Sequence, residues 1–390
     1  MQYNFDETID RNHTNCEKYD ERRKFFGTEE VLPMWVADMD FRTPDFIVNA
    51  IKKRADHEIY GYSFQPESFY EAIIYWLNQR HQWKVKRNWL TVSPGIVTAL
   101  NMAVLAYSRP GDKVIIQPPV YFPFMWSVRN NGRQLVFNQL KKEGNQYKMD
   151  FEDLEKKIDK RTKLFFLCNP HNPGGRVWTK SELKRLSEIC VKHGIVMVSD
   201  EIHSDIIYSG HKHIPLAMVS EDAAQNTVTF VAPSKTFNIA GLTTSEVIIP
   251  NQKLFDKFRI IQENIHLGES NIFGITALEA AYQHGEEWLE QLLHYLEGNL
   301  DFIDDFLKKR LPQIKLIRPE STFLAWLNCE DLGLNDNELK KFMIEKAKVA
   351  LNPGPDFGPG GEGFMRLNFG CPRKTLNQGL EQIAAAVDKL

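Results

Sequence analysis

The sequence predicts an α/β fold in which a mainly parallel sheet is covered by helices, with a smaller α+β domain beside it. Short apolar strands alternate with helical stretches between about residues 90 and 250, which is typical of βαβ units and a parallel sheet. The chain also has 390 residues. Because this exceeds the size of one ordinary core, one large and one smaller domain are expected.

The first clear elements are a helix and two strands. Residues 96–107 have a helical pattern that ends at Arg109-Pro-Gly-Asp112, and residues 113–117 form a short buried strand. Residues 163–168 are the next clear strand.

A helix with recognisable ends follows that strand. Thr179 and Glu182 have the spacing of a capping box, Gly194 ends the helix, and residues 195–199 form the next strand. This βαβ unit implies a parallel sheet, because its crossover makes the two strands parallel. In such sheets, binding sites form at the carboxyl ends of the strands.

A long helix and a second group of elements complete the chain. Apolar residues keep a helical period over residues 286–311, and this helix is expected to run between the two domains. Beyond it the pattern predicts a strand at 321–327, a helix at 337–347, a Gly/Pro-rich loop at 352–363 and a strand at 364–369.

The chain is therefore expected to have three parts. Residues 1–48, most of which lack a clear period, would form an N-terminal arm and part of the small domain. Residues 49–285 would form the large domain, and residues 286–390 the C-terminal small domain.

Composition and charge indicate a globular protein with a small-molecule substrate. The net charge is −3 without a basic stripe, so neither nucleic acid nor an anionic membrane is an expected partner. The N-terminus lacks signal-peptide regions, and no apolar run approaches the roughly 18 residues of a membrane span, so a cytoplasmic location is expected. The five cysteines have no CxxC spacing, so reduced thiols and no metal site are expected.

Lys235 is the most informative single residue. An apolar strand leads it into the turn Pro233-Ser-Lys-Thr236, where a desolvated amine can act as a nucleophile and form a Schiff base. Alone, such a lysine is more often a solvated surface charge. Two further motifs change that interpretation, because Asp200 closes one apolar strand and Asn172 follows another.

A lysine, a carboxylate and an amide at strand ends are the groups that pyridoxal 5′-phosphate (PLP) requires. Lys235 would be the imine partner, Asp200 the counter-ion of the pyridinium nitrogen, and Asn172 a donor to the ring oxygen. His203 is a second candidate donor, although a lone histidine is more often structural. Taken alone, Asp200 would be explained as a helix cap or an ordinary ion pair.

The phosphate of such a cofactor has a candidate site at a helix N-terminus. The amides of Gly95, Ile96 and Val97 would begin the helix at 96–107, where anions bind. Ser234, beside the lysine, could add a hydroxyl donor. A Pro-Gly pair before a helix is by itself usually only a turn.

Two further side chains are suited to the ring and the substrate. Tyr121 lies on a proline-flanked loop and could stack on a flat ring. Arg366 lies on an alternating strand and, if it faces inward, could bind an α-carboxylate through two hydrogen bonds. A core aromatic residue and an exposed arginine are the alternative interpretations.

Together these residues resemble the fold-type I PLP enzymes, the aminotransferase class I/II superfamily, over essentially the whole chain. Within it the chain is similar to the MalY/PatB-type cystathionine β-lyases, or cysteine-S-conjugate β-lyases. The strings that carry this similarity are Met34-Trp-Val-Ala-Asp-Met-Asp-Phe41, Tyr60-Gly-Tyr-Ser63, Asn169-Pro-His-Asn-Pro-Gly-Gly-Arg-Val-Trp178, Asp200-Glu-Ile-His-Ser-Asp205, Ala232-Pro-Ser-Lys-Thr-Phe-Asn-Ile-Ala-Gly-Leu242 and Arg366-Leu-Asn-Phe-Gly370.

The resemblance implies a mainly parallel seven-stranded sheet, a large PLP-binding domain and a set of site residues. It implies that Tyr62 binds the cofactor phosphate of the neighbouring subunit, which makes the active unit a homodimer with shared sites. Catalytic roles are implied for Lys235, Tyr121, Tyr62 and Asp200, and substrate contacts for Trp35, Ala37, Asp38, Asn172 and Arg366.

The resemblance also implies a reaction, C–S bond cleavage by α,β-elimination. L-cystathionine would give homocysteine, pyruvate and ammonia, and L-cysteine would give hydrogen sulfide, pyruvate and ammonia, as in cysteine and methionine metabolism. An aminotransferase is the main alternative, because the same residues serve both reactions. A regulatory protein that retains PLP and acts by protein contact is a third.

Overall fold

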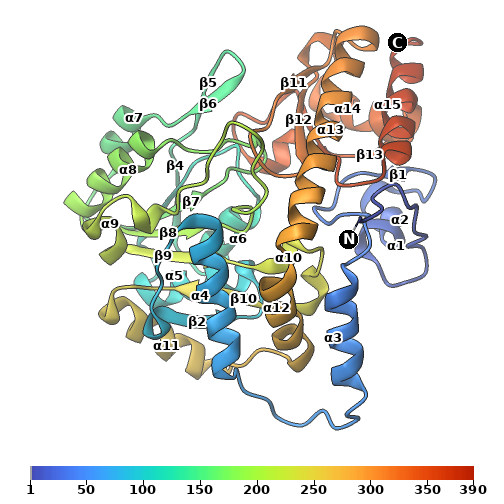
Figure 1. The fold of residues 1–390 in the computed structure, drawn as a ribbon. Coiled ribbons are helices and arrows are strands. Elements are labelled where there is room, and N and C mark those ends of the chain that lie inside the picture. Colours follow the sequence, from blue (N-terminus) through green and yellow to red (C-terminus); the bar gives the residue numbers. More distant parts are fainter. Residues whose placement is uncertain (1) are drawn as a thin grey trace.

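The computed structural model describes residues 2–390, and its largest sheet has seven strands in the order β2-β10-β9-β8-β7-β3-β4 (Figure 1). Neighbouring strands are parallel except at β10, which is antiparallel to both β2 and β9. The strands are β2 (Leu90–Ser93), β3 (Lys113–Ile116), β4 (Gln134–Phe137), β7 (Thr162–Cys168), β8 (Val196–Asp200), β9 (Thr227–Val231) and β10 (Ser245–Ile248). The predicted mainly parallel, seven-stranded sheet is confirmed.

Helices cover both faces of this sheet, and each face has its own apolar core. One core joins the sheet to α5 (Ile96–Tyr107), α6 (Pro123–Arg129) and α11 (Gln252–Asn264). The other joins it to α7 (Phe151–Lys157), α8 (Lys180–Lys192) and α9 (Glu221–Gln225). Strand side chains alternate between the two, since Phe166 enters the first core and Phe165 the second.

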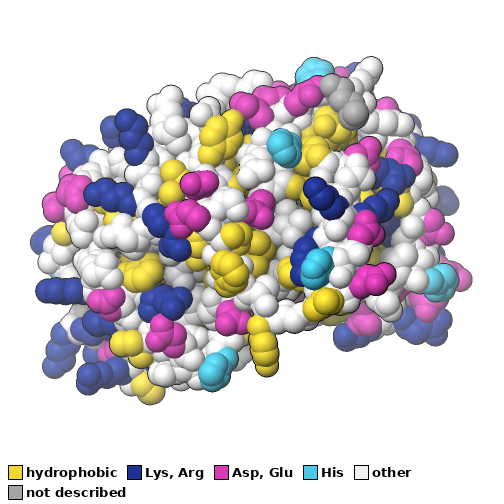
Figure 2. Space-filling view, turned by 60° about the horizontal axis from the view of Figure 1, so that its bottom comes forward, with side chains coloured by type: hydrophobic (Ala, Val, Ile, Leu, Met, Phe, Trp, Pro, Cys, Tyr) yellow, Lys and Arg dark blue, Asp and Glu magenta, His cyan; other side chains and the backbone are white. Residues whose placement is uncertain are grey.

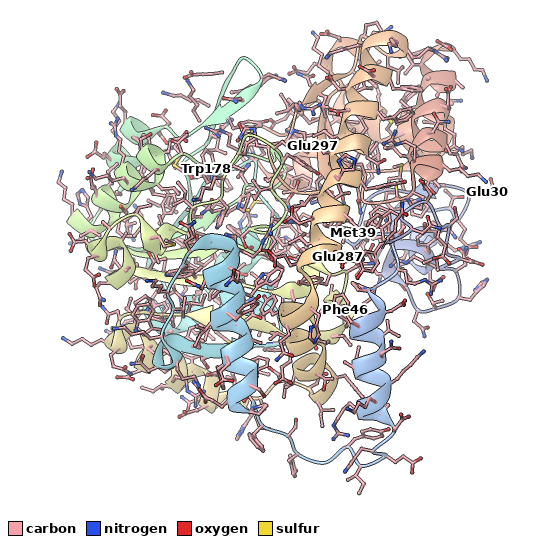
Figure 3. The ribbon with its side chains drawn as sticks, in the orientation of Figure 1. Glu30, Met39, Phe46, Trp178, Glu287 and Glu297 are labelled. Carbon is pink, nitrogen blue, oxygen red and sulfur yellow. The ribbon has the colours of Figure 1, made fainter. Side chains whose placement is uncertain are left out.

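The βαβ unit around α8 has the ends that the sequence predicts. The Thr179 side chain accepts from the backbone of Glu182, whose own side chain bonds back to Thr179, so the capping box is present. Trp178, labelled in Figure 3, lies just before this helix, and its Nε1 donates to the Cys168 carbonyl at 2.9 Å. This bond attaches the start of the helix to the end of β7.

A group of long helices lies beside the sheet and connects it to the rest of the chain. The helix α12 packs against both α3 and α4, and α13 runs from this group up to the smaller sheet (Figure 1). Their bounds are α3 (Asp45–Ala55), α4 (Glu67–His81), α12 (Ile272–His284) and α13 (Glu286–Arg310). The long helix predicted at 286–311 is confirmed within one residue.

The smaller sheet is antiparallel, in the order β11-β12-β15-β14. Its elements are β11 (Lys315–Ile317), β12 (Leu324–Asn328), β14 (Asn352–Pro353) and β15 (Phe364–Asn368), with α14 (Asp336–Lys341), a π-helical turn (Phe342–Lys346) and α15 (Arg373–Val387) beside them. The strand predicted at 321–327 starts late, because Thr322 has a φ of 70° and interrupts extended backbone. The loop predicted at 352–363 is not irregular throughout, since it contains β14.

The N-terminal strand belongs to neither of these sheets and forms a separate two-stranded sheet. Here β1 (Leu32–Pro33) pairs in parallel with β13 (Val349–Ala350), after the short helices α1 (Glu17–Asp20) and α2 (Arg22–Phe26). The domain ranges 1–48, 49–285 and 286–390 stay a prediction, and Met1 lies outside the described residues.

The remaining elements are short. They are the hairpin β5 (Lys141–Glu143) and β6 (Gln146–Lys148), α10 (Pro233–Thr236), and 3₁₀ turns at Arg87–Trp89, Leu216–Met218, Ala240–Leu242, Glu330–Leu332 and Gly354–Phe357. Between residues 2 and 390, no helix combines the length and apolarity needed to cross a membrane.

Candidate functional site

Three adjacent strands of the large sheet end at the same edge. Cys168, which ends β7, is paired with Asp200, which ends β8, and Asp200 is paired with Phe230 near the end of β9. Asn172 follows β7 by four residues, and Lys235 lies in α10 immediately after β9. The structure therefore brings Asn172, Asp200 and Lys235 to one edge of the sheet.

Lys235 is half-buried, and its amine faces a backbone carbonyl. Its Nζ donates to the carbonyl of Ala37 at 2.5 Å. Desolvation lowers the pKa of Lys235 below its usual value, and the charge of Arg366 adds to this, while Asp38 and Asp200 act in the opposite direction. A lowered pKa brings the amine closer to its neutral, nucleophilic form.

Asp200 is a buried carboxylate with few partners. It is 4% exposed and accepts one backbone hydrogen bond, from the amide of Ile202 at 3.2 Å. Burial raises its pKa to about 7, although Ile202 and the charge of Lys235 act to lower it. Across residues 2–390 no cation forms an ion pair with it at 4.0 Å or less. A cationic ring nitrogen at this carboxylate would stabilise its charged form.

Arg366 is a buried guanidinium whose hydrogen-bond partners are all neutral. It lies on β15 and donates to Asn172 Oδ1 (3.1 Å), to the Trp35 carbonyl (3.0 Å) and to Asn352 Oδ1 (2.7 Å). Its Nε is buried and has no hydrogen-bond partner within the described chain. Burial lowers the pKa of Arg366 to about 10. An unpaired buried guanidinium is suited to a ligand that brings its own carboxylate.

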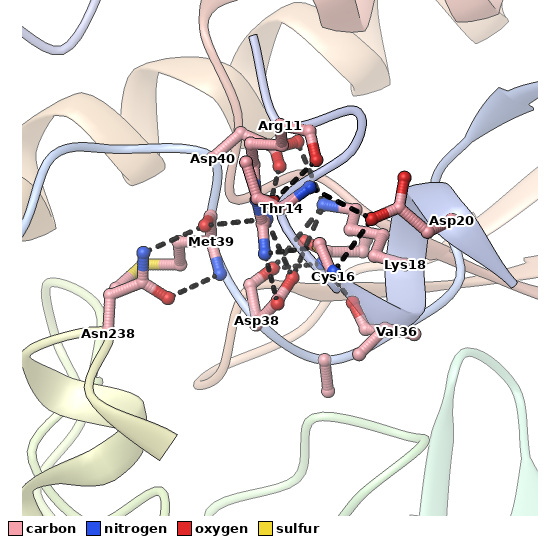
Figure 4. Close-up of polar contacts among 12 residues, drawn as sticks. Arg11, Thr14, Cys16, Lys18, Asp20, Val36, Asp38, Met39, Asp40 and Asn238 are labelled. Carbon is pink, nitrogen blue, oxygen red and sulfur yellow. Dashed lines mark hydrogen bonds and ion pairs between the residues drawn. The ribbon is translucent and has the colours of Figure 1, made fainter. Parts of the chain in front are cut away.

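The segment 35–41 crosses the site, where Lys235 and Arg366 donate to its carbonyls. It is held from two sides, and Figure 4 shows its contacts with Asn238. Asn238, three residues after Lys235, accepts from the amide of Met39 at 2.9 Å and donates to the carbonyls of Met39 (2.8 Å) and Phe41 (2.9 Å). Asn368, on β15, donates to the Asp38 carbonyl at 2.6 Å. The segment that carries the Ala37 carbonyl is thereby fixed to both the lysine turn and the smaller sheet.

An ionic cluster fixes the outer side of the same segment (Figure 4). Arg11 pairs with Asp38 and Asp40, both at 2.6 Å, and Lys18 pairs with Asp40 at 2.8 Å. Burial would raise the pKa of Asp38, but the hydrogen bond from Arg11 and the charges of Lys18 and Arg11 lower it below its usual value. The Asp38 carboxylate is thus turned toward the N-terminal residues, and the indole nitrogen of Trp35 donates to the Lys18 carbonyl.

Tyr121 and His203 complete the inner part of the site. The amide of Tyr121 donates to the Asn172 carbonyl at 3.1 Å, and burial raises the pKa of its phenol to about 12. His203 is buried, and desolvation lowers its pKa to about 3, so its ring is neutral near pH 7. Its Nδ1 has no hydrogen-bond partner among the residues that the structure describes.

The predicted phosphate groups lie at two helix starts. Gly95 caps α5 with a φ of 142°, a value that favours glycine, and Ile96 and Val97 are the first residues of that helix. Ser234 lies in α10 and is half-buried. Tyr62 differs from these residues, because its side chain is fully exposed in the single chain.

Several asparagines that organise the site were not predicted from the sequence. Asn238, Asn352 and Asn368 hold the segment 35–41 and Arg366, and Cys168 Sγ accepts from the amide of Asn172 at 3.3 Å. Their signal in the sequence is weak: a polar residue within an apolar strand, or a polar residue soon after the lysine. Within residues 2–390, no group of three His, Cys, Asp or Glu side chains could hold a metal ion.

Comparisons with known proteins agree over almost the whole chain. The model of the family described as aminotransferase class I and II matches residues 29–383. The cystathionine β-lyase PatB of Bacillus subtilis (strain 168) is 49% identical over 385 residues, which cover 98% of this chain and 100% of that protein. The protein MalY of Escherichia coli (strain K12) is 34% identical over 388 residues, 99% of each chain.

A solved structure extends this agreement to the fold. The PLP-bound C–S lyase of Staphylococcus hominis has a TM-score of 0.94 and 37% identity, and the match covers 99% of this chain and 98% of that one. The fold, the site and these similarities lead to one conclusion: this chain belongs to the aminotransferase class I and II family, in the group of PatB and MalY.

Proposed function

We propose that this protein is a PLP-dependent C–S β-lyase that cleaves L-cystathionine to homocysteine, pyruvate and ammonia. By the same chemistry it would convert L-cysteine to hydrogen sulfide, pyruvate and ammonia. The observation that carries the proposal is that Lys235, Asp200 and Arg366 meet in one site, where they form no ion pairs with described residues. The choice of C–S cleavage is supported by the relatives that are named cystathionine β-lyase and C–S lyase.

The residues present fit PLP group by group. The amine of Lys235 would attach the cofactor, and Asp200 would pair with its ring nitrogen. Asn172 and the unpartnered Nδ1 of His203 could form hydrogen bonds with its polar ring substituents. The open N-terminus of α5 would bind the phosphate. When bound, PLP supplies an electron sink for the charge that is left when a bond to Cα breaks.

The chain's own residues would orient the substrate and move the proton. Arg366, braced by Asn172 and Asn352, would bind the α-carboxylate and so fix the direction of the Cα–H bond. The free amine of Lys235 would act as the base that removes the Cα proton of the substrate. Loss of the thiolate from Cβ, with a proton taken up to give the thiol, would complete the elimination. Hydrolysis of the released enamine by water would then give pyruvate and ammonia, so no keto acid is needed.

A coupled pyruvate assay tests this proposal. Purified protein with PLP and L-cystathionine, and with no keto acid added, should release pyruvate, and the Lys235→Ala variant should release almost none. Turnover that requires a keto acid and yields a new amino acid would instead assign the aminotransferase reaction. Pyruvate release by Lys235→Ala at the wild-type rate would contradict the assignment of the lysine.

The proposal includes a homodimer with shared sites, as the exposed loop before α4 suggests. Ile59, Tyr60, Tyr62 and Phe64 are all more than half exposed there. Figure 2 turns the bottom of the molecule toward the viewer and shows apolar side chains gathered on that face. Burial of such a loop against a second copy would bring Tyr62 to the partner's phosphate site. The cytoplasmic location stays a prediction.

A further inference from the structure

A buried carboxylate outside the ligand site lies behind the lysine turn. Asp205 follows β8 by five residues and is 5% exposed. Its Oδ2 accepts a hydrogen bond from the hydroxyl of Thr236 at 2.9 Å. Thr236 immediately follows Lys235 in α10, and its side chain is 1% exposed. The carboxylate therefore contacts the residue next to the lysine rather than the lysine itself.

The turn that carries Lys235 needs such external support. The helix α10 has only four residues, Pro233–Thr236, and no side chain caps its N-terminus. A helix of this length has few internal hydrogen bonds and is marginal on its own. The direction in which Lys235 points is therefore set by bonds from α10 to the surrounding chain, and the Thr236 hydroxyl makes one that ends on a charged group.

Asp205 is itself firmly held by α4. Its Oδ2 also accepts from Trp76 Nε1 at 3.0 Å, and its Oδ1 lies 3.3 Å from His81 Nε2 and 4.0 Å from Arg80 Nε. Burial alone would raise the pKa of Asp205, but the proximity of His81 and Arg80 lowers it below the usual value. The group that anchors the lysine turn is thus an anion fixed to a fifteen-residue helix.

We propose that Asp205 is a positioning residue for Lys235, which it holds in place through the hydroxyl of Thr236. This inference rests on the proposed role of Lys235 as the lysine that binds PLP. PLP binding should therefore depend on the hydroxyl of Thr236 and not on the bulk of its side chain, because only the hydroxyl reaches the carboxylate.

Two variants of Thr236 test whether PLP binding depends on its hydroxyl. Thr236→Val removes the hydroxyl and keeps the shape, whereas Thr236→Ser keeps the hydroxyl. Thr229→Val is the matched control, because Thr229 is buried in β9 and its hydroxyl has no hydrogen-bond partner among residues 2–390. Each holoprotein is dialysed to equilibrium against a series of PLP concentrations, and the visible absorbance of the lysine-bound cofactor gives the Kd of PLP.

The expected result is a rise of about tenfold in the Kd of PLP for Thr236→Val, the size expected for one lost hydrogen bond to a charged group. Thr236→Ser should stay within about twofold of wild type, and Thr229→Val should be unchanged. Thr236→Ala replaces the valine variant if that protein does not fold. A valine variant that binds PLP as wild type does, or a serine variant that fails to restore binding, would overturn the proposal.

A double mutant shows whether Asp205 acts through Thr236. Asp205→Asn should raise the Kd of PLP in the wild-type background. In Thr236→Val it should change the Kd less than about twofold, because that variant already lacks the hydrogen bond to Asp205. If the fold-changes in Kd of the two single variants multiply in the double mutant, Asp205 acts by another route, and the inference is overturned. Failure of the proposed function is a separate result, in which wild-type protein takes up no PLP or Lys235→Ala binds it with unchanged spectrum and affinity.

Discussion

Asp200 and Arg366 are buried, and no residue between 2 and 390 forms an ion pair with either side chain. Asp200 has one backbone donor and a pKa raised to about 7, and Arg366 has neutral partners and an unpartnered Nε. Burying a charge without an opposite charge destabilises the fold, so such groups are typical of sites that a charged ligand completes. Removing either charge should therefore stabilise the protein without its ligands and lower its activity.

The first prediction concerns Asp200→Asn in the PLP-free protein. Because the folded pKa of Asp200 is raised above its unfolded value of about 4, the folded state binds more protons between pH 4 and about 7, and its stability falls as pH rises through that window. The variant should therefore unfold at a higher temperature than wild type at pH 8, and the two midpoints should converge near pH 4.

The same substitution should depress catalysis. It removes the charge that would pair with the ring nitrogen, so pyruvate release from L-cystathionine should fall at least about a hundredfold, the cost of roughly 3 kcal/mol of charge stabilisation. A variant that is no more stable at pH 8 would show that Asp200 is not strained in the empty site. Wild-type turnover would show that it is not the counter-ion.

The second prediction concerns Arg366→Lys, which keeps the charge. An ammonium cannot make the planar two-point contact with a carboxylate, so kcat/KM should fall roughly thirtyfold or more. This corresponds to a loss of about 2 kcal/mol of transition-state stabilisation. Arg310→Lys is the control, because Arg310 is half exposed and its carboxylate contacts are 3.7 and 3.9 Å long. Unchanged kcat/KM for every amino-acid substrate would place Arg366 outside the substrate site.

At the scale of elements, the segment 35–41 acts as one wall of the site. It is bound by Arg11 of the ionic cluster, by Asn368 of β15 and by Asn238 near the lysine turn, which are far apart in the sequence. The N-terminal residues thus contribute to the site through their carbonyls and through ion pairs, not through a catalytic side chain of their own. The contacts of Asn238 connect this wall directly to the turn that carries Lys235.

The third prediction tests that connection. Asn238 has a φ of 57°, so Asn238→Gly keeps the backbone free of strain while it removes three hydrogen bonds. The free energy of unfolding should fall by about 2–3 kcal/mol, and kcat should fall with it. Lys348→Gly is the control, because Lys348 also has a positive φ (55°) but is exposed. Equal stability changes in the two variants would contradict the bracing role of Asn238.

Helices and strands with a complete local signal could be predicted from the sequence. The ranges 96–107 and 286–311 match α5 and α13 because long apolar periods and turn residues define both. The short N-terminal helices, β13 and β14 could not be predicted, because two to five residues carry too little periodicity. Their conformation depends on pairing with distant residues, as between Leu32 and Val349.

From the sequence pattern, the candidate site residues could be predicted only where they stand at or just after the end of an apolar strand. Lys235, Asp200 and Asn172 follow apolar strands, and parallel strands end at one edge. Arg366 needed the resemblance, because one sequence does not show which face of a strand is inward. Asn238 was missed because its partners lie nearly 200 residues away. The ion pairs of Arg11 were missed because its partners lie in irregular backbone. Asn352 is only 14 residues from Arg366, but its strand has two residues and carries no pattern that predicts this contact.

At the scale of the whole molecule, the proposed shared site needs a second copy of the chain. The single chain provides the lysine, the carboxylate and the arginine at one site, but it leaves Tyr62 fully exposed on a loop between α3 and α4. A two-fold dimer would place each loop against the other subunit, because contacts in such a pair are reciprocal. The cofactor phosphate would then be bound by both chains.

The fourth prediction is complementation between two inactive variants. If each site takes Lys235 from one subunit and Tyr62 from the other, mixing Lys235→Ala with Tyr62→Ala should restore activity. With equal amounts and random exchange, about half the dimers are mixed and about a quarter of all sites are wild type. The measurement needs an impaired Tyr62→Ala protein and a tagged mixture that proves exchange. No recovery despite exchange would mean that sites are not shared.

Locating the cofactor on the chain would show whether the three strand ends form one PLP site at Lys235. Borohydride reduction of the yellow holoprotein fixes PLP to its lysine, and mass spectrometry of the peptides identifies that residue. We expect label on the peptide that contains Lys235 and no label in Lys235→Ala. Label on any other lysine, or none in protein that releases pyruvate from L-cystathionine, would contradict this expectation.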